Sequence, residues 1–92
     1  MQKYKNRPTV IEAAQWKGMT NVDAKKFADE NDIPVFKVGT MEGKFGLIVQ
    51  TLEGKAVAKQ GTWILKGTKG EFWPVRADIF KQKYEKVEND SK

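Results

Sequence analysis

The apolar positions over residues 9–16 fall on both sides of an extended chain, and this pattern predicts the first strand. The segment is rich in β-branched residues and follows Pro8, which is tolerated where a strand begins because its missing N–H need not join the ladder. The strand divides these apolar positions between two faces, with Val10, Ala14 and Trp16 on one and Ile11 and Ala13 on the other.

The spacing then becomes helical and predicts a helix over residues 21–31, with Ala24, Phe27 and Ala28 on its apolar side. Thr20 is a favourable N-cap residue, and Asp23 suits the first turn, where the helix dipole favours negative charge. Asn31-Asp32 and then Pro34 end the helix, because the residue before a proline avoids the helical conformation.

The following segment has the pattern of an antiparallel meander, since short apolar runs alternate with turns that contain glycine. The predicted turns lie at residues 39–43, 53–54, 60–61 and 67–70, where glycine supplies a positive φ at little cost. The strands between them are predicted at residues 35–38, 45–51, 55–59, 62–66 and 71–75. Because charge alternates with small apolar residues at 55–59, that strand is predicted to be exposed or at an edge.

A short helix over residues 77–83 and a last strand over 84–87 complete the pattern, with a disordered tail at 88–92. We therefore expect one α+β domain over residues 1–92. It contains a small curved antiparallel β-sheet of about five or six strands, one helix packed on the sheet, and a short C-terminal helix. Its predicted core consists of Ile11, Phe27, Leu47, Val49, Ile64, Phe72, Ile79 and Phe80.

Composition narrows the chemistry, because the chain has neither histidine nor cysteine. It lacks the usual general base, the usual nitrogen and sulfur metal ligands and a thiol nucleophile. We therefore expect no enzymatic activity, no metal and no cofactor. A carboxylate pair such as Glu12 with Glu71 is conceivable for acid–base chemistry, but no spacing in the sequence brings the two together.

The formal net charge of +5 raises the question of a nucleic-acid partner. The lysines are spread along the chain, and only Arg7 and Arg76 are arginine, the residue favoured for base and phosphate recognition. A lysine-rich hydrated surface is the preferred interpretation. With no signal peptide and no membrane-spanning stretch in the pattern, we expect a cytoplasmic protein.

Four residues are candidates for binding: Trp63, Trp73, Arg76 and Asp78. The two tryptophans flank one turn, so they are expected to be cross-strand neighbours that either build the core or leave one half-exposed anchor. Asp78 is expected to cap the short helix or pair with Arg76, which otherwise serves as an anion contact. The Gly-Thr-Lys-Gly sequence at 67–70 lacks the length of a phosphate-binding loop and is interpreted as a hairpin turn.

The residues around these candidates resemble a family of small phage and prophage proteins. The resemblance rests on residues 61–75, then on Asp78-Ile79-Phe80 and Tyr84-Glu85, which follow a pattern written GDWI-x-G-x-x-GE-(F/Y/W)-P…DIF…YE. Arg7-Pro8, Glu12-Ala13 and Gln15-Trp16 are similar to the start of the same family. Thr62 departs from it, since the family usually has Asp there. The resemblance implies a phage or prophage origin and no particular activity.

These observations favour a phage-encoded binding protein that engages a host or phage protein, with possible interference in a host process or defence. The aromatic residues exceed what a minimal core needs, and the lysine-bearing edge at 55–59 leaves a place for a specific partner. The alternatives are a weak nucleic-acid-binding accessory protein, a small-molecule-binding protein and a homodimer in which the exposed aromatic residue meets its own copy.

Overall fold

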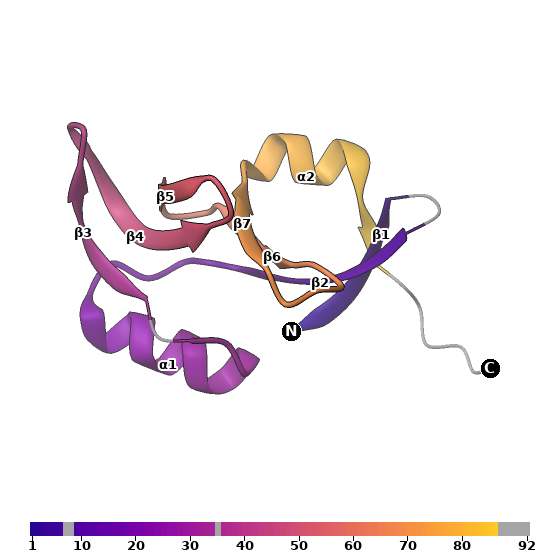
Figure 1. The fold of residues 1–92 in the computed structure, drawn as a ribbon, viewed down its shortest axis with the longest axis horizontal. Helices are drawn as coiled ribbons and strands as arrows, with labels where there is room; N and C mark the ends of the chain where they lie inside the picture. The colour runs from indigo at the N-terminus through magenta and orange to yellow at the C-terminus, as the bar shows by residue number, and fades with distance from the viewer. Residues whose placement is uncertain (7–8, 35, 87–92) are drawn as a thin grey trace.

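The chain folds into two antiparallel sheets and two helices in a computed structural model that describes residues 1–6, 9–34 and 36–86 (Figure 1). The elements are β1 (Gln2–Asn6), β2 (Thr9–Gln15), α1 (Asn21–Asn31), β3 (Lys37–Met41), β4 (Lys44–Thr51), β5 (Gly54–Ala58), β6 (Trp63–Lys66), β7 (Phe72–Val75), α2 (Ala77–Lys83) and β8 (Glu85–Lys86). The α+β class, the long helix and the short C-terminal helix are confirmed. Predictions that concern Arg7, Pro8, Val35 and residues 87–92 lie outside the described residues.

The strands do not form one sheet, as the meander pattern suggested, but two. The first sheet has five strands in the order β7-β6-β2-β1-β8, and the second has three in the order β3-β4-β5. The unpredicted strand β1 pairs with both β2 and β8, which makes the first sheet wider than expected. Strands β4 and β5 lie against β7 without pairing with it, so the two sheets meet at that side of the larger one.

Two turns differ from their predicted positions. Thr51 is opposite Gly54, so Leu52 and Glu53 occupy the tip of the β4–β5 hairpin, one residue earlier than predicted. The Thr51 hydroxyl fixes this turn, because it donates to the Gly54 carbonyl at 2.7 Å and accepts from the Glu53 N–H at 3.1 Å. The segment 39–43, predicted as a loop, instead continues β3 to Met41 and turns tightly afterwards.

Helix α1 begins and ends where the sequence predicts. The Thr20 hydroxyl accepts from the Asp23 N–H, and the Asp23 carboxylate accepts from the Thr20 N–H, which together form a capping box. Asp32 ends the helix in the left-handed conformation at φ 57°, and its N–H donates to the Ala28 carbonyl. Neither of the two helices in the described part of the chain has the length and apolar character needed to cross a membrane.

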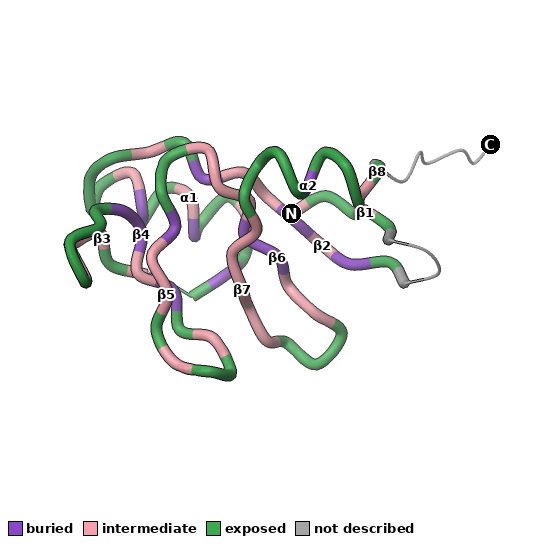
Figure 2. The backbone as a smooth tube through the Cα atoms, turned by 90° about the horizontal axis from the view of Figure 1, so that it is seen from above, coloured by how far each residue is buried: buried purple, intermediate pink, exposed green. Residues whose placement is uncertain are grey.

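The apolar side chains form two clusters on opposite faces of the five-stranded sheet. The inner cluster lies between the two sheets and α1, and its buried members are Trp16, Ala24, Leu47, Val49, Ala58 and Ile64. The aromatic cluster lies under α2, and it consists of Ile11, Ala13, Leu65 and Phe80 with the partly buried Tyr4, Trp63, Trp73, Val75 and Tyr84. Figure 2 shows the buried segments running through the middle of the molecule beneath exposed turns.

The predicted core is largely confirmed, with one error. Ile11, Leu47, Val49, Ile64 and Phe80 are buried, and Phe27 and Phe72 pack against the inner cluster while remaining partly exposed. Ile79 is 36% exposed, which contradicts the prediction. The reason is helical geometry: α2 turns Phe80 and the following Tyr84, four residues apart, toward the sheet, so the adjacent Ile79 faces the flank.

Candidate functional site

Trp16 and Trp63 both pack within the apolar clusters of the fold. Trp16 is 1% exposed and packs edge-on against Phe27 at 5.4 Å between ring centroids. Trp63 stacks on Phe80 with centroids 4.1 Å apart, and Tyr4 approaches both rings edge-on at 5.2 and 4.8 Å. Such aromatic pairs stabilise a fold by about 0.5–1.5 kcal/mol each beyond the area they bury. Trp63, a predicted binding residue, therefore serves the aromatic cluster.

Trp73 lies on the neighbouring strand in a different setting. Strand register places Trp63 opposite Val75 and Leu65 opposite Trp73, so the two tryptophans are diagonal neighbours rather than a direct cross-strand pair. Among the aromatic rings of the described residues, the Trp73 indole makes no stacked or edge-on pair. The residue packs against the aromatic cluster and also lines an open groove of about 450 Å³.

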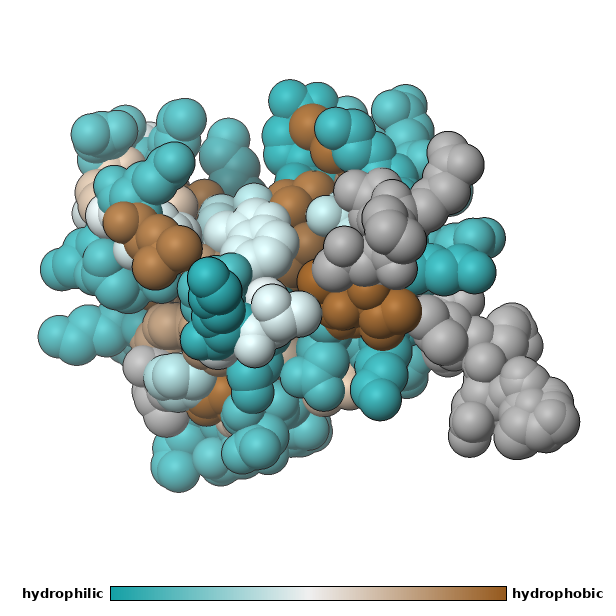
Figure 3. All heavy atoms as spheres, turned by 45° about the vertical axis from the view of Figure 1, so that its right-hand side comes forward, coloured by the Kyte–Doolittle hydropathy of each residue, from teal (hydrophilic) through white to brown (hydrophobic). Residues whose placement is uncertain are grey.

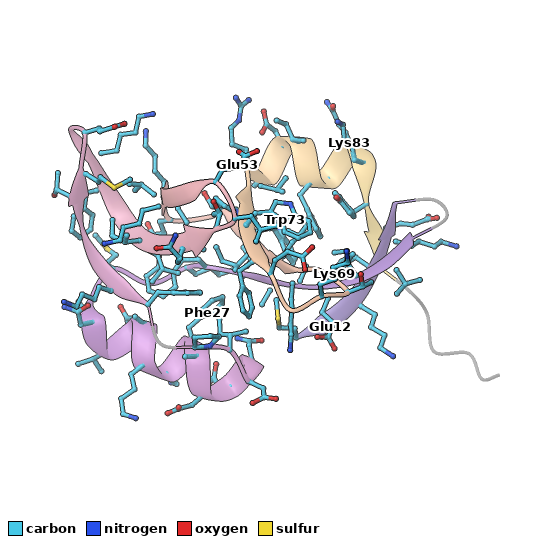
Figure 4. All side chains as sticks on the ribbon, in the orientation of Figure 1. Glu12, Phe27, Glu53, Lys69, Trp73 and Lys83 are labelled. Carbon is cyan, nitrogen blue, oxygen red and sulfur yellow. The ribbon has the colours of Figure 1, made fainter. Side chains whose placement is uncertain are left out.

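The groove lies between β7 and the tip of the β4–β5 hairpin, and Figure 4 shows Glu53 and Trp73 together there. The residues that line it are Thr51, Leu52, Glu53, Ala56, Glu71, Phe72, Trp73 and Pro74. Figure 2 shows the β4–β5 and β6–β7 hairpins extending toward the same side of the molecule. We refer to this feature as the β7 groove.

The β7 groove runs along the free edge of the five-stranded sheet. Strand β7 is the last in the sheet order and pairs only with β6. Successive side chains of a strand point to opposite faces, so a groove bordered by four consecutive residues, 71–74, must follow the strand's edge. Pro74 fits this position, since a proline is accepted in an edge strand where its missing N–H faces away from the ladder.

Several groove residues were missed by the sequence reasoning. Leu52 is 83% exposed, the highest value among the large apolar residues of the described chain that reach the surface. A leucine in the two-residue tip of a hairpin is the signal that could have identified it, but the turn had been placed one residue later. Glu53 and Glu71 join the groove only because the two sheets meet there, and no local pattern shows that meeting.

Arg76 and Asp78 form an ion pair, which confirms one of the two roles expected for Asp78. Arg76 Nη2 lies 2.6 Å from Asp78 Oδ2 and Arg76 Nε donates to Asp78 Oδ1 at 3.1 Å. The guanidinium holds the pKa of Asp78 below its usual value, and the carboxylate raises that of Arg76. Asp78 is not the N-cap residue, which is Arg76, but it lies in the first turn of α2, where its Oδ1 accepts from the Ile79 N–H at 2.9 Å. Both side chains are exposed and neither lines the β7 groove.

The remaining candidates are also placed by the structure. The turn at 67–70 is confirmed as a hairpin turn, closed by the Gly70 N–H donating to the Gly67 carbonyl at 3.1 Å. Glu12 lines a separate hollow with Lys3 and Lys66, whereas Glu71 lines the β7 groove. Strand β5 is an edge strand as predicted, although its last residue, Ala58, is fully buried.

The described residues contain no group of three or more carboxylate side chains arranged to hold a metal ion. The β7 groove combines aromatic and apolar residues with two glutamates at a sheet edge. Comparison of the chain with protein-family models, with curated proteins and with solved structures finds no match.

Proposed function

We propose that this chain is a non-enzymatic binding protein of phage or prophage origin that engages a host or phage protein through the β7 groove. The observation that carries the proposal is the apolar wall formed by Leu52 and Trp73 at an open groove. Covering an exposed leucine removes apolar surface from water, and tryptophan is the residue most often found as the anchor of an interface.

The shape of the β7 groove suits an extended segment of a protein. It follows a strand edge and opens to solvent along the hairpin tip, which is the geometry used when a peptide lies beside a sheet. Pro74 interrupts the row of edge donors, so full strand addition is disfavoured and side-chain contacts must supply much of the affinity. Figure 3 shows apolar groups reaching the surface in several places among hydrophilic ones.

Two further lines of support come from the sequence. The absence of histidine and cysteine favours binding over catalysis, because the usual groups for proton transfer and nucleophilic attack are missing. The resemblance of residues 61–75 and the DIF and YE segments to phage and prophage proteins favours the origin. Most of the shared aromatic residues, including Trp63 and Phe80, lie in the aromatic cluster, which explains their retention by the needs of the fold.

The test compares two exposed apolar residues, Leu52 in the groove and Val22 on α1, which are 83% and 78% exposed. Proteins captured from a host lysate by the wild-type chain are identified, purified and titrated by calorimetry against Leu52→Ser and Val22→Ser. Because Leu52 anchors the groove, Leu52→Ser should weaken binding by about tenfold, a loss of about 1.4 kcal/mol. Val22→Ser should bind like the wild type.

Two outcomes contradict the proposal. One is a ligand whose affinity does not change with Leu52→Ser. The other is a chain that captures no protein in gentle salt, or that captures only nucleic acid in a salt-sensitive manner. Light scattering is measured in parallel, because a dimer that Leu52→Ser dissociates would assign the groove to a second copy of the chain.

A further inference from the structure

We propose that the β7 groove selects a partner segment carrying an arginine or lysine side chain, an inference that rests on the function proposed above. The chain has a net charge of +5, yet the two charged residues that line the groove, Glu53 and Glu71, are both acidic. The charge of the lining residues therefore has the opposite sign to the net charge of the whole molecule. A partner with a basic side chain at this position gains complementarity that the rest of the surface does not offer.

The backbone along the groove adds further acceptors. The Gly67 N–H donates to the Glu71 carbonyl at 2.8 Å, which makes these two residues a hydrogen-bonded pair. Since pairs alternate along an antiparallel ladder, Phe72 and Pro74 occupy non-hydrogen-bonded positions, and their carbonyls point away from β6. Pro74 has no N–H, so the outer edge over these two residues presents two carbonyls and one donor. This excess of acceptors matches the donors of an ammonium or a guanidinium.

Trp73 supplies the third element of a cation site. It lines the groove together with Glu53, and its indole is not paired with another described ring. The face of an indole attracts a cation by its quadrupole, and the guanidinium of arginine also stacks on it. The groove therefore offers an aromatic face and carboxylates to the same side chain.

Both glutamates are carried by tight turns, and the carboxylate of Glu71 is held by its own turn. The Glu71 carboxylate accepts from the Lys69 N–H at 3.0 Å and lies over Gly67, where a Cβ would meet its carboxyl carbon at 2.5 Å. At Glu53 the Thr51 hydroxyl accepts from the backbone N–H, which fixes the turn that carries the residue. Groups already held in place lose little freedom when a ligand arrives, which favours binding.

The test uses a displayed library of random linear peptides selected on the intact chain. Peptides that bind the wild type and Val22→Ser but not Leu52→Ser are kept, because they use the β7 groove. We expect these peptides to share an arginine or lysine next to an apolar residue. Replacing that basic residue by glutamine should weaken binding about tenfold. Glu53→Gln should weaken the basic peptide by a similar factor and leave its glutamine version unchanged.

The outcomes separate this inference from the function on which it rests. Groove-dependent peptides without a basic residue, or basic peptides indifferent to Glu53→Gln, would overturn the charge selection and leave the binding function standing. A library with no Leu52-dependent binder overturns both. Glu71→Gln serves as a second variant with the same expected direction, and its fold is checked by circular dichroism because Glu71 also holds the turn.

Discussion

Trp63 and Trp73 lie on neighbouring strands of one hairpin and are both partly buried, but their surroundings differ. Trp63 is enclosed by Phe80 and Tyr4, which contact its ring on the face and the edge. Trp73 also packs against the aromatic cluster, but no described ring stacks on it, and it lines the groove with the hairpin tip and two glutamates. Exposure alone does not separate a structural tryptophan from a binding one, whereas the identity of the neighbours does.

The aromatic cluster should respond to substitution with the largest loss of stability. Phe80 is buried and stacks on both Trp63 and Tyr84, so Phe80→Ala is expected to cost about 3–5 kcal/mol in the free energy of unfolding. Ile79→Ala, its exposed neighbour, should cost less than about 1 kcal/mol. Urea titration of both variants measures the difference. Equal losses would show that α2 does not rest on Phe80.

A direct comparison of the two tryptophans gives the next largest effect. Trp63→Leu removes two aromatic contacts, and Trp73→Leu removes none between described rings. We therefore expect Trp63→Leu to destabilise the fold by about 1–3 kcal/mol more than Trp73→Leu. Only Trp73→Leu should weaken the ligand, measured at a temperature where both variants are folded. The opposite ranking would reverse the assignment of the two residues.

Two glycines that face each other across β3 and β4 test the packing of the β4–β5 hairpin, which forms one wall of the groove. A Cβ at Gly46 would lie 2.3 Å from the Ala58 carbonyl oxygen, whereas a Cβ at Gly39 meets nothing within 4 Å. Gly46→Ala should cost about 1–3 kcal/mol and loosen ligand binding, because β4 must move. Gly39→Ala should be neutral in thermal unfolding. A harmless Gly46→Ala would contradict the packing of β5 on β4.

The capping box at the start of α1, which lies outside the aromatic cluster and the β7 groove, should contribute less to stability, and its contribution should depend on pH. Thr20→Ala should cost about 1 kcal/mol by removing the cap. The Met19 and Thr20 N–H groups donate to Asp23 and hold its pKa below the usual value. Asp23 therefore stabilises the fold above the pKa of the unfolded chain, and this contribution disappears as the pH falls through its folded pKa.

The measurement for the cap is the melting temperature as a function of pH for the wild type, Asp23→Asn and Asp29→Asn. Asp29→Asn is the matched control, since it changes a carboxylate on the exposed side of the same helix. The gap between the wild type and Asp23→Asn should close in acid. A constant gap would mean that the carboxylate charge has no part in the capping box. Neither variant should alter the ligand affinity of the β7 groove.

The sequence predicts the individual helices and most strands well, but it does not predict that the strands form two sheets that pack together at β7. Helix α1 was predicted to the residue because Thr20, Asp23 and Pro34 act through neighbours in the chain, and α2 follows from its short apolar spacing. Strand β1 was missed because the short polar segment 2–6 has no apolar alternation, and its place depends on β2 and β8.

The candidate site shows the same limit. Trp73 was identified from its residue type, but the sequence could not separate it from Trp63, since both flank one turn at similar spacing. Leu52 and Glu53 were missed because they reach the groove across the contact between the two sheets. That contact depends on which faces of β4, β5 and β7 pack together, and no local pattern encodes it.

The central claim, that a partner protein lies on the β7 groove, is tested most directly by photo-crosslinking in host cells. A photoreactive amino acid is placed singly at three exposed apolar positions: Leu52 in the β4–β5 turn, Val22 in α1 and Phe45 near the start of β4. The account predicts one specific protein adduct at position 52, absent at 22 and 45, that is lost when Trp73→Leu is added. Adducts confined to position 22 or 45, or an adduct at 52 that survives Trp73→Leu, would contradict it.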